Sequence, residues 1–212
     1  MAAPDWGVLA PGRLLTVAFG NVAGAQVAQS HRRAAQRCSI GPQSAVLVPV
    51  PEAEALVGAW RAVHDPSARA GVPAHITLVV PWVPPQEIKP GHFAELEELL
   101  ADQHAFGYSL EAVRWFGKRV LWLAPSPAAP FKRMTSVLAE HFDTPPWQGE
   151  FPEVVPHLTV GLAGPGEGNG MSEAAEDLAS KLPINCRATE VDVMCGDGAD
   201  WTVAHQVKLQ AG

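Results

Sequence analysis

Apolar and polar residues in positions 43–212 are arranged in short blocks that switch between the period of a strand and that of a helix. Short apolar runs bounded by proline or glycine predict strands, and apolar residues every three or four positions predict amphipathic helices. The predicted strands are 44–50, 75–80, 108–113, 119–123, 155–162, 184–194 and 201–209. The predicted helices are 51–64, 91–103, 131–142 and 172–182.

The order of these elements repeats, as β-α-β-α-β followed by β-α-β-α-β-β. The middle strand of each half carries the same pattern, His-x-Thr followed by an aliphatic residue and preceded by valine and proline. The two copies are His75-Ile76-Thr77 and His157-Leu158-Thr159. Self-similarity in matching places predicts a duplicated unit.

Residues i and i+2 of a strand share a face, so the histidine and threonine of each copy project together. If the halves pack about a pseudo-two-fold axis, His75 and Thr77 face His157 and Thr159 across one cleft. One imidazole can then remove a proton while the other donates one, and the hydroxyls can hold phosphate oxygens. In-line attack on a phosphodiester needs this set of groups and no metal. A single His-x-Thr is common by chance in a core strand, whereas two matched copies are not.

Several stretches resemble the two-histidine phosphoesterase superfamily, whose founding members are 2′-5′ RNA ligase-like proteins. They are 73–82 (PAHITLVVPW), 119–125 (RVLWLAP) and 153–160 (EVVPHLTV). The resemblance covers about 44–209 and implies an α+β, bilobal fold with antiparallel sheets around a central cleft. It gives lobes of roughly 43–114 and 118–212. It also implies His75 and His157 as catalytic residues and Thr77 and Thr159 as phosphate-binding residues.

The function expected from these residues is metal-independent opening of 2′,3′-cyclic or 2′,5′-linked phosphodiesters to 2′-phosphates, reversible as 2′-5′ RNA ligation. Which histidine is the acid and which the base stays open. Cleavage of cyclic dinucleotides is a related possibility. The alternative from another class is a protein that binds nucleotides or RNA ends in the same cleft without turnover.

Three further residues are candidates near this site. Arg119, next to Lys118 at a predicted hairpin, resembles a phosphate-proximal base of the family, although a solvated turn explains it equally well. Trp82 follows the first motif strand and could stack on a base, or it could simply pack, whereas Trp122 is expected in the core. The other histidines have no metal-ligand spacing, so we expect no metal and no cofactor.

Charge limits the substrate further. The net charge is −7, and the acidic excess falls on the residues after position 42. Because affinity for long nucleic acid comes mainly from neutralised phosphates, we expect a small nucleotide or RNA-end substrate and no tracking of a long strand. No window is apolar enough for a membrane helix, and we expect a monomer.

Residues 1–42 lack this regularity and predict a poorly ordered N-terminal extension. A signal peptide is the alternative, but Asp5 precedes the single Arg13, and Gly20 and Asn21 interrupt the apolar run. Three cysteines do not make a disulfide framework. Cys186 and Cys195 would lie far apart on the predicted strand 184–194 and its end. We therefore expect a reducing, cytoplasmic location.

Overall fold

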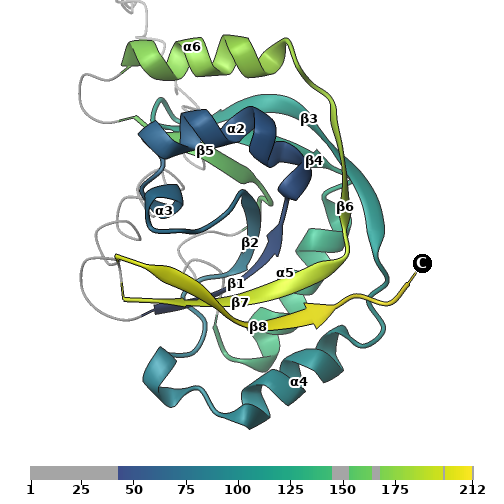
Figure 1. Cartoon of the computed structure of the whole chain (residues 1–212). Helices are drawn as coiled ribbons and strands as arrows, with labels where there is room; N and C mark the ends of the chain where they lie inside the picture. The colour runs from purple at the N-terminus through teal and green to yellow at the C-terminus, as the bar shows by residue number, and fades with distance from the viewer. Residues whose placement is uncertain (1–42, 145–152, 164–167, 198, 212) are drawn as a thin grey trace, which may run out of the picture.

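The computed structural model describes residues 43–144, 153–163, 168–197 and 199–211 (Figure 1). The predicted extension 1–42 lies outside these residues. The strands are β1 (Gln43–Pro49), β2 (His75–Val79), β3 (Phe106–Phe116), β4 (Val120–Ser126), β5 (Leu158–Leu162), β6 (Ile184–Ala188), β7 (Glu190–Gly196) and β8 (Trp201–Lys208). The helices are α2 (Pro51–His64), α3 (Pro66–Arg69), α4 (Pro90–Leu100), α5 (Ala129–His141) and α6 (Gly168–Ala179), with a 3-10 turn η1 (Pro85–Glu87).

Local sequence explains several of these boundaries. Proline occupies the first turn of α2, where a missing N–H costs nothing. Asp65 ends α2 and caps α3 by accepting a hydrogen bond from Ser67 N at 2.9 Å. Gly117, with φ of +59°, makes the tight turn between β3 and β4.

All eight strands belong to one sheet in the order β6-β3-β4-β5-β2-β1-β7-β8, and every pair with a register is antiparallel. The prediction of a single strand over 184–194 is wrong, because the chain leaves β6 at one edge of the sheet and enters β7 near the other. Only Thr189 separates them. A sheet joined in this way must curl, and β6 runs along the molecule from α6 to β7 (Figure 1).

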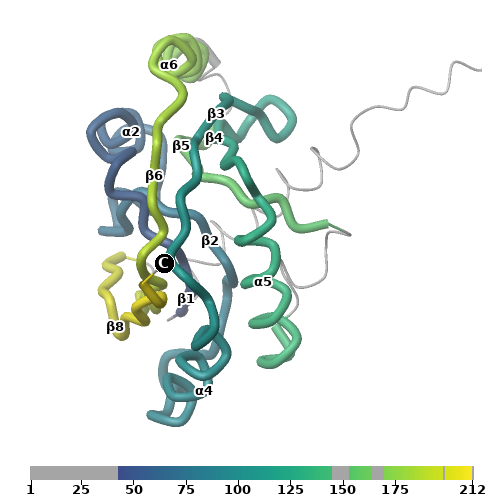
Figure 2. Tube along the Cα trace, turned by 90° about the vertical axis from the view of Figure 1, so that its right-hand side faces the viewer, coloured from purple at the N-terminus to yellow at the C-terminus, as the bar shows by residue number. Residues whose placement is uncertain are grey.

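The helices cover the sheet in two groups. Helix α2 packs on β5 and β6, and α6 on β3, whereas α5 packs on β2 and α4 on β8. Helices α4 and α6 lie at opposite ends of the molecule in both views (Figures 1 and 2). Helix α2 approaches β5 so closely that a Cβ on Gly161 would lie 2.5 Å from His64 Cβ, so this position requires glycine.

The main core lies on one face of the sheet. It includes Ile76 of β2 and Leu158 of β5, both fully buried, together with residues of α2, α4, α5 and α6. Two smaller clusters are separate from this core: Phe116, Val120 and Trp122, and Leu47, Val72 and Met194. The predicted α+β class with antiparallel strands is confirmed.

The sheet divides at its weakest junction into two four-stranded halves. Strands β2 and β5 share one register pair, Ile76 with Leu158. Each half contains one His-x-Thr strand, but β3 belongs with β4–β6, and β7 and β8 belong with β1 and β2. The lobe boundaries at 43–114 and 118–212 stay a prediction. No helix in the described ranges has the length and hydropathy needed to span a membrane.

Candidate active site

The two His-x-Thr segments meet at the centre of the sheet. The antiparallel pair of Ile76 and Leu158 puts the middle residues of the motifs opposite each other. Extending this register by one residue places His75 opposite Thr159 and Thr77 opposite His157, at cross-strand spacings of about 5 Å. Side chains alternate along a strand, so all four lie on the face opposite Ile76 and Leu158. The register therefore supports the predicted grouping of two imidazoles and two hydroxyls.

Both imidazoles are oriented in the same way. The Nδ1 of His75 lies 2.8 Å from Pro73 O, and the Nδ1 of His157 lies 2.7 Å from Val155 O. A carbonyl oxygen can only accept, so Nδ1–H donates in both cases and the tautomer is fixed. In the neutral form of each ring, the proton is therefore on Nδ1 and the lone pair on Nε2. The repeated two-residue offset extends the duplication from sequence to side-chain geometry.

His157 lies against aromatic rings. Phe116 and Trp122 make edge contacts with it, with ring centroids at 4.9 and 5.7 Å, and only 6% of His157 is exposed. The pKa of His157 is lowered to about 4, mainly because the ring is buried; the hydrogen bond to Val155 opposes this shift, and the charge of His75 adds to it. The imidazole of His157 is therefore neutral at neutral pH, and it interacts electrostatically with His75.

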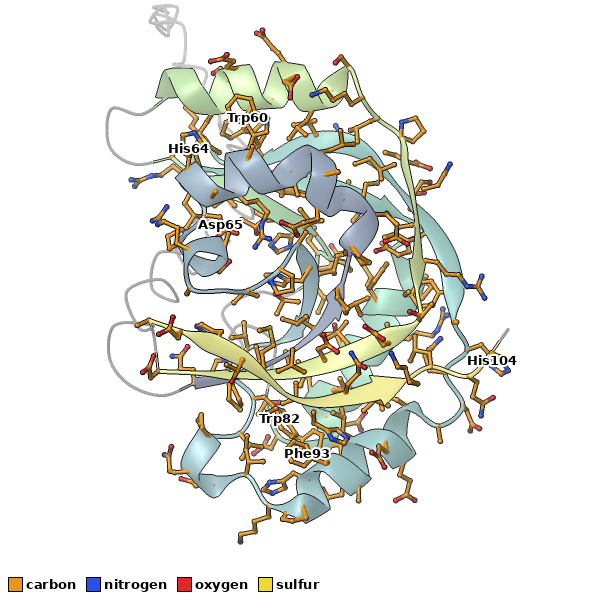
Figure 3. The ribbon with its side chains drawn as sticks, in the orientation of Figure 1. Trp60, His64, Asp65, Trp82, Phe93 and His104 are labelled. Carbon is orange, nitrogen blue, oxygen red and sulfur yellow. The ribbon has the colours of Figure 1, made fainter. Side chains whose placement is uncertain are left out.

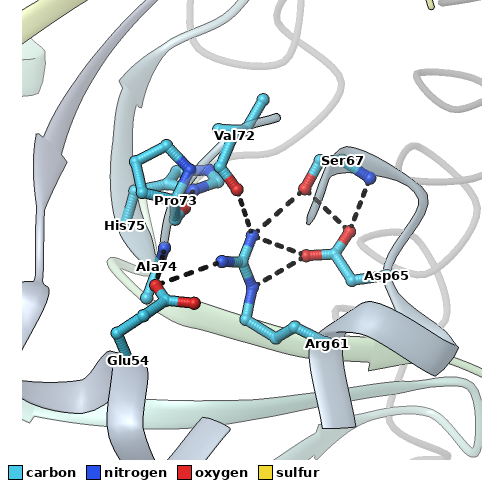
Figure 4. A network of polar contacts seen from close by, with 8 residues as sticks. All are labelled: Glu54, Arg61, Asp65, Ser67, Val72, Pro73, Ala74 and His75. Carbon is cyan, nitrogen blue, oxygen red and sulfur yellow. Dashed lines mark hydrogen bonds and ion pairs between the residues drawn. The ribbon is translucent and has the colours of Figure 1, made fainter. Parts of the chain in front are cut away.

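His75 is partly exposed and lies beside charged groups of α2 (Figure 4). Burial and the Arg61 guanidinium lower the pKa of His75, and the Pro73 carbonyl and the carboxylates of Asp65 and Glu54 oppose them. Arg61 is itself 1% exposed and donates to Asp65 Oδ2 from Nε and Nη2, at 3.0 and 2.9 Å. The two histidines thus share a motif but differ in surroundings.

The structure does not place Trp82 where the sequence suggested. Trp82 is 3% exposed and packs against Phe93 and Phe142, with ring centroids at 6.3 and 5.1 Å. Figure 3 shows it near α4, well away from Asp65. The prediction that Trp82 stacks on a base is wrong, because a buried ring has no face to offer a ligand.

The basic pair lies at the hairpin between β3 and β4. Lys118 is exposed in the turn, and Arg119 Nε donates to Ala163 O at 3.4 Å, just beyond β5. This contact holds Arg119 beside the end of β5, four residues past Thr159. Its role with the phosphate stays a prediction.

Sequence reasoning missed two arginines. Arg61 lies 14 residues before His75, and its one signal is that it continues the buried i, i+4 series of Ala53 and Val57 along α2. Arg114 is exposed on β3 opposite Trp122, which is itself opposite Thr159. Arg114 therefore shares the face of the four motif side chains, two strands from β5. In the described parts of the chain, no three His, Cys, Asp or Glu side chains form a group that could hold a metal ion.

Comparison with known proteins defines the class. Residues 49–200, more than half of the chain, match the profile of the 2′-5′ RNA ligase superfamily. The chain belongs to this superfamily, and the predicted resemblance to the two-histidine phosphoesterase superfamily is confirmed. Membership supports an enzyme of the phosphoesterase and ligase type. Among curated protein sequences, none matches the chain.

Several solved structures are similar to the chain. TT0787 of Thermus thermophilus aligns with a TM-score of 0.51 at 19% identity, over 80% of this chain and 98% of that one. E. coli LigT in complex with 3′-AMP aligns at 0.48 and 20% identity, and LigT in complex with ATP at 0.47 and 17%; both cover 80% of this chain and 98% of LigT. At 19% identity, the likeness to TT0787 concerns the fold alone.

Proposed function

We propose that this protein is a metal-independent phosphoesterase that opens 2′,3′-cyclic or 2′,5′-linked phosphodiesters of nucleotides or RNA ends to 2′-phosphates. The observation that carries the proposal is the register of Ile76 with Leu158, which groups two imidazoles and two hydroxyls on one face. Superfamily membership supports the same chemistry. Ligation is the same opening of the cyclic phosphate with a 5′-hydroxyl in place of water as the nucleophile, so that the bond to the 3′-oxygen breaks and a 2′,5′ linkage forms.

The different surroundings of the histidines support a division of roles. His157, enclosed by Phe116 and Trp122, is the general base, because desolvation favours its neutral form. His75 is the general acid, because it is only partly buried and lies beside Asp65 and Glu54, which oppose the lowering of its pKa by burial and Arg61. His157 Nε2 takes a proton from water, which attacks phosphorus. His75 Nε2 gives a proton to the leaving 3′-oxygen as its bond to phosphorus breaks.

The substrate completes the charge balance. Burial lowers the pKa of both histidines in the free protein, so an imidazolium needs a further negative charge beside it. The phosphodiester anion supplies that charge when it binds between them, and this raises the pKa of His75. Thr77 and Thr159 donate to the non-bridging oxygens, where negative charge accumulates in the transition state.

The test uses the four nucleoside 2′,3′-cyclic monophosphates in the presence of EDTA, with products separated by chromatography. We expect nucleoside 2′-phosphates from the wild type, and from His157→Ala a rate of product formation that is lower by roughly 10²- to 10⁴-fold. His141→Ala is the control, since His141 is half exposed and pairs with Glu95 on α4. Binding of the nucleotides without any product would contradict an enzymatic function and would favour a nucleotide-binding protein instead. A requirement for a divalent metal would contradict the mechanism.

A further inference from the structure

We infer that Glu54, Arg61 and Asp65 form a positioning network that sets the orientation of the His75 imidazole. The catalytic consequence of this inference rests on the proposed function, but the contacts themselves do not. The network acts on the backbone that leads into β2, and its members are positioning residues rather than catalytic ones.

Three consecutive residues before His75 are each held through the backbone (Figure 4). Val72 O accepts from Arg61 Nη2 at 3.1 Å, and Ala74 N donates to Glu54 Oε2 at 2.7 Å. Between them, Pro73 O accepts from His75 Nδ1. Because the residues on both sides of Pro73 are held, the Pro73 carbonyl has a fixed position. The hydrogen bond from His75 Nδ1 to this carbonyl then sets the direction in which Nε2 points.

Burial of the Arg61 guanidinium costs folding free energy. The guanidinium is buried, Asp65 and Ser67 take two of its nitrogens, and Asp65 also caps α3. Nη1 is buried without a hydrogen-bond partner among the described residues, with Glu54 Oε2 at 3.9 Å. A buried charge with an unsatisfied N–H stabilises a fold less than an apolar side chain would. Its presence favours a role in placing the segment that contains Pro73.

The same groups set the electrostatic surroundings of His75. The charged and titratable groups that act on it or respond to it are Glu54 and Arg61 of α2, Asp65 at the end of that helix, and His157 at the start of β5. The arginine and the carboxylates act on the His75 pKa in opposite directions. Removing one member therefore changes the pKa with a sign that depends on which member is removed.

The first experiment measures kcat and KM on the 2′,3′-cyclic nucleotide. Arg61→Met is expected to lower kcat on the order of 10²-fold, as for a displaced catalytic group, with KM changed little. Arg61→Lys keeps the charge but cannot make the planar fork, so it restores activity only partly. Glu54→Gln, at a half-exposed position on the surface of α2, keeps the test available if the Arg61 variants do not fold. A rise in KM with kcat unchanged in Glu54→Gln would overturn the inference.

The second experiment needs no activity. Nitrogen-15 NMR of the His75 ring is expected to show the Nδ1–H tautomer, a lower pKa in Glu54→Gln and a higher pKa in Arg61→Met. Glu52→Gln is the matched control, because Glu52 lies on the same helix and also accepts from a backbone N–H, Arg187 N at 2.9 Å. It is expected to leave the pKa of His75 unchanged. An Nε2–H tautomer, or equal shifts in Glu52→Gln and Glu54→Gln, would overturn the network even in a fully active enzyme. If the wild type has no activity while these shifts appear, the proposed function fails and the network stands.

Discussion

The two halves of the candidate site carry the same motif in opposite surroundings. His75 lies beside a guanidinium and two carboxylates, which come from α2 and its end. His157 lies beside the rings of Phe116 and Trp122. Both rings donate from Nδ1 to the carbonyl two residues earlier. The local geometry of the repeat is thus retained, while the groups that control proton affinity differ.

This difference teaches how a duplicated unit can perform acid and base chemistry with one residue type. Charges respond to a bound anion and to each other, whereas an apolar wall acts by excluding water. The half-site of His75 and Thr77, which lies beside charged side chains, suits the residue that must carry a proton. The half-site of His157 and Thr159, which lies beside the aromatic rings, suits the residue that must begin the reaction in its neutral form. The following predictions would break or sharpen this contrast.

The largest effect is expected from the histidines themselves. His75→Ala and His157→Ala should each lower kcat by roughly 10²- to 10⁴-fold, the usual contribution of a general acid or base. The double variant should be little worse than either single one, because acid and base act as a unit. Steady-state kinetics with circular dichroism as a folding control measures this. Activity near that of the wild type in one single variant would show that the histidine replaced in that variant is not catalytic.

The hydroxyls come next. Thr77→Val and Thr159→Val keep the shape of the side chain and remove a donor to the transition state, so each should cost about 2–4 kcal/mol in kcat/KM. Thr202→Val, at an exposed position on β8, is the matched control and should change nothing. If only one threonine matters, the phosphate is held by one half-site, and the symmetric placement of the two hydroxyls is wrong.

The third prediction concerns stability in acid. The pKa of His157 is about 4 in the folded protein, against 6.5 for an unfolded histidine. The folded state therefore resists protonation, and stability is lost as the pH falls from about 6.5 towards 4. The expected loss from His157 between pH 7 and pH 4.5 is about 2–3 kcal/mol, an upper bound for one buried group. Urea unfolding at both pH values compares the wild type with His157→Gln. An equal loss of stability in both proteins would show that protonation of His157 between Phe116 and Trp122 is not the cause of the loss.

The motif that the two half-sites share is predictable from the sequence, but the contrast between their surroundings is not. Alternation placed each histidine with its threonine because that rule is local to a strand. The pairing of Ile76 with Leu158 and the break at Thr189 depend on which strands meet, and no local period encodes that. The position of Trp82 after a motif strand fits either stacking on a base or packing, and only the contacts with Phe93 and Phe142 decide for packing. The role of Arg61 is not predictable from the helical pattern, because its contact with Val72 O depends on how the chain folds back after α2.

The smallest expected effect concerns charge at the site and the size of the substrate. Few bases are available to a phosphate: Lys132 pairs with Glu153 at 2.7 Å, and Arg119 is held at the hairpin. The side chain of Arg114 makes no hydrogen bond or ion pair with the described residues, and it lies on the face of the motif side chains. Binding should therefore weaken with salt with a slope of roughly −1 to −2, and a cyclic mononucleotide should bind about as well as a 20-mer with the same end.

Arg114→Gln tests which half-site supplies that charge. In the inactive His75→Ala background, it should reduce the salt slope by about one, because one fewer counterion is released when the phosphate binds. Arg187→Gln is the control: Arg187 is also exposed on a strand but pairs with Gly107, seven residues along β3 from Arg114, or roughly 23 Å at ~3.3 Å per residue. It should leave the slope unchanged. The measurement is titration calorimetry across a salt series. A steep slope with strong preference for the 20-mer would mean that an extended basic surface binds the strand, and that the phosphate is not held mainly between the two half-sites.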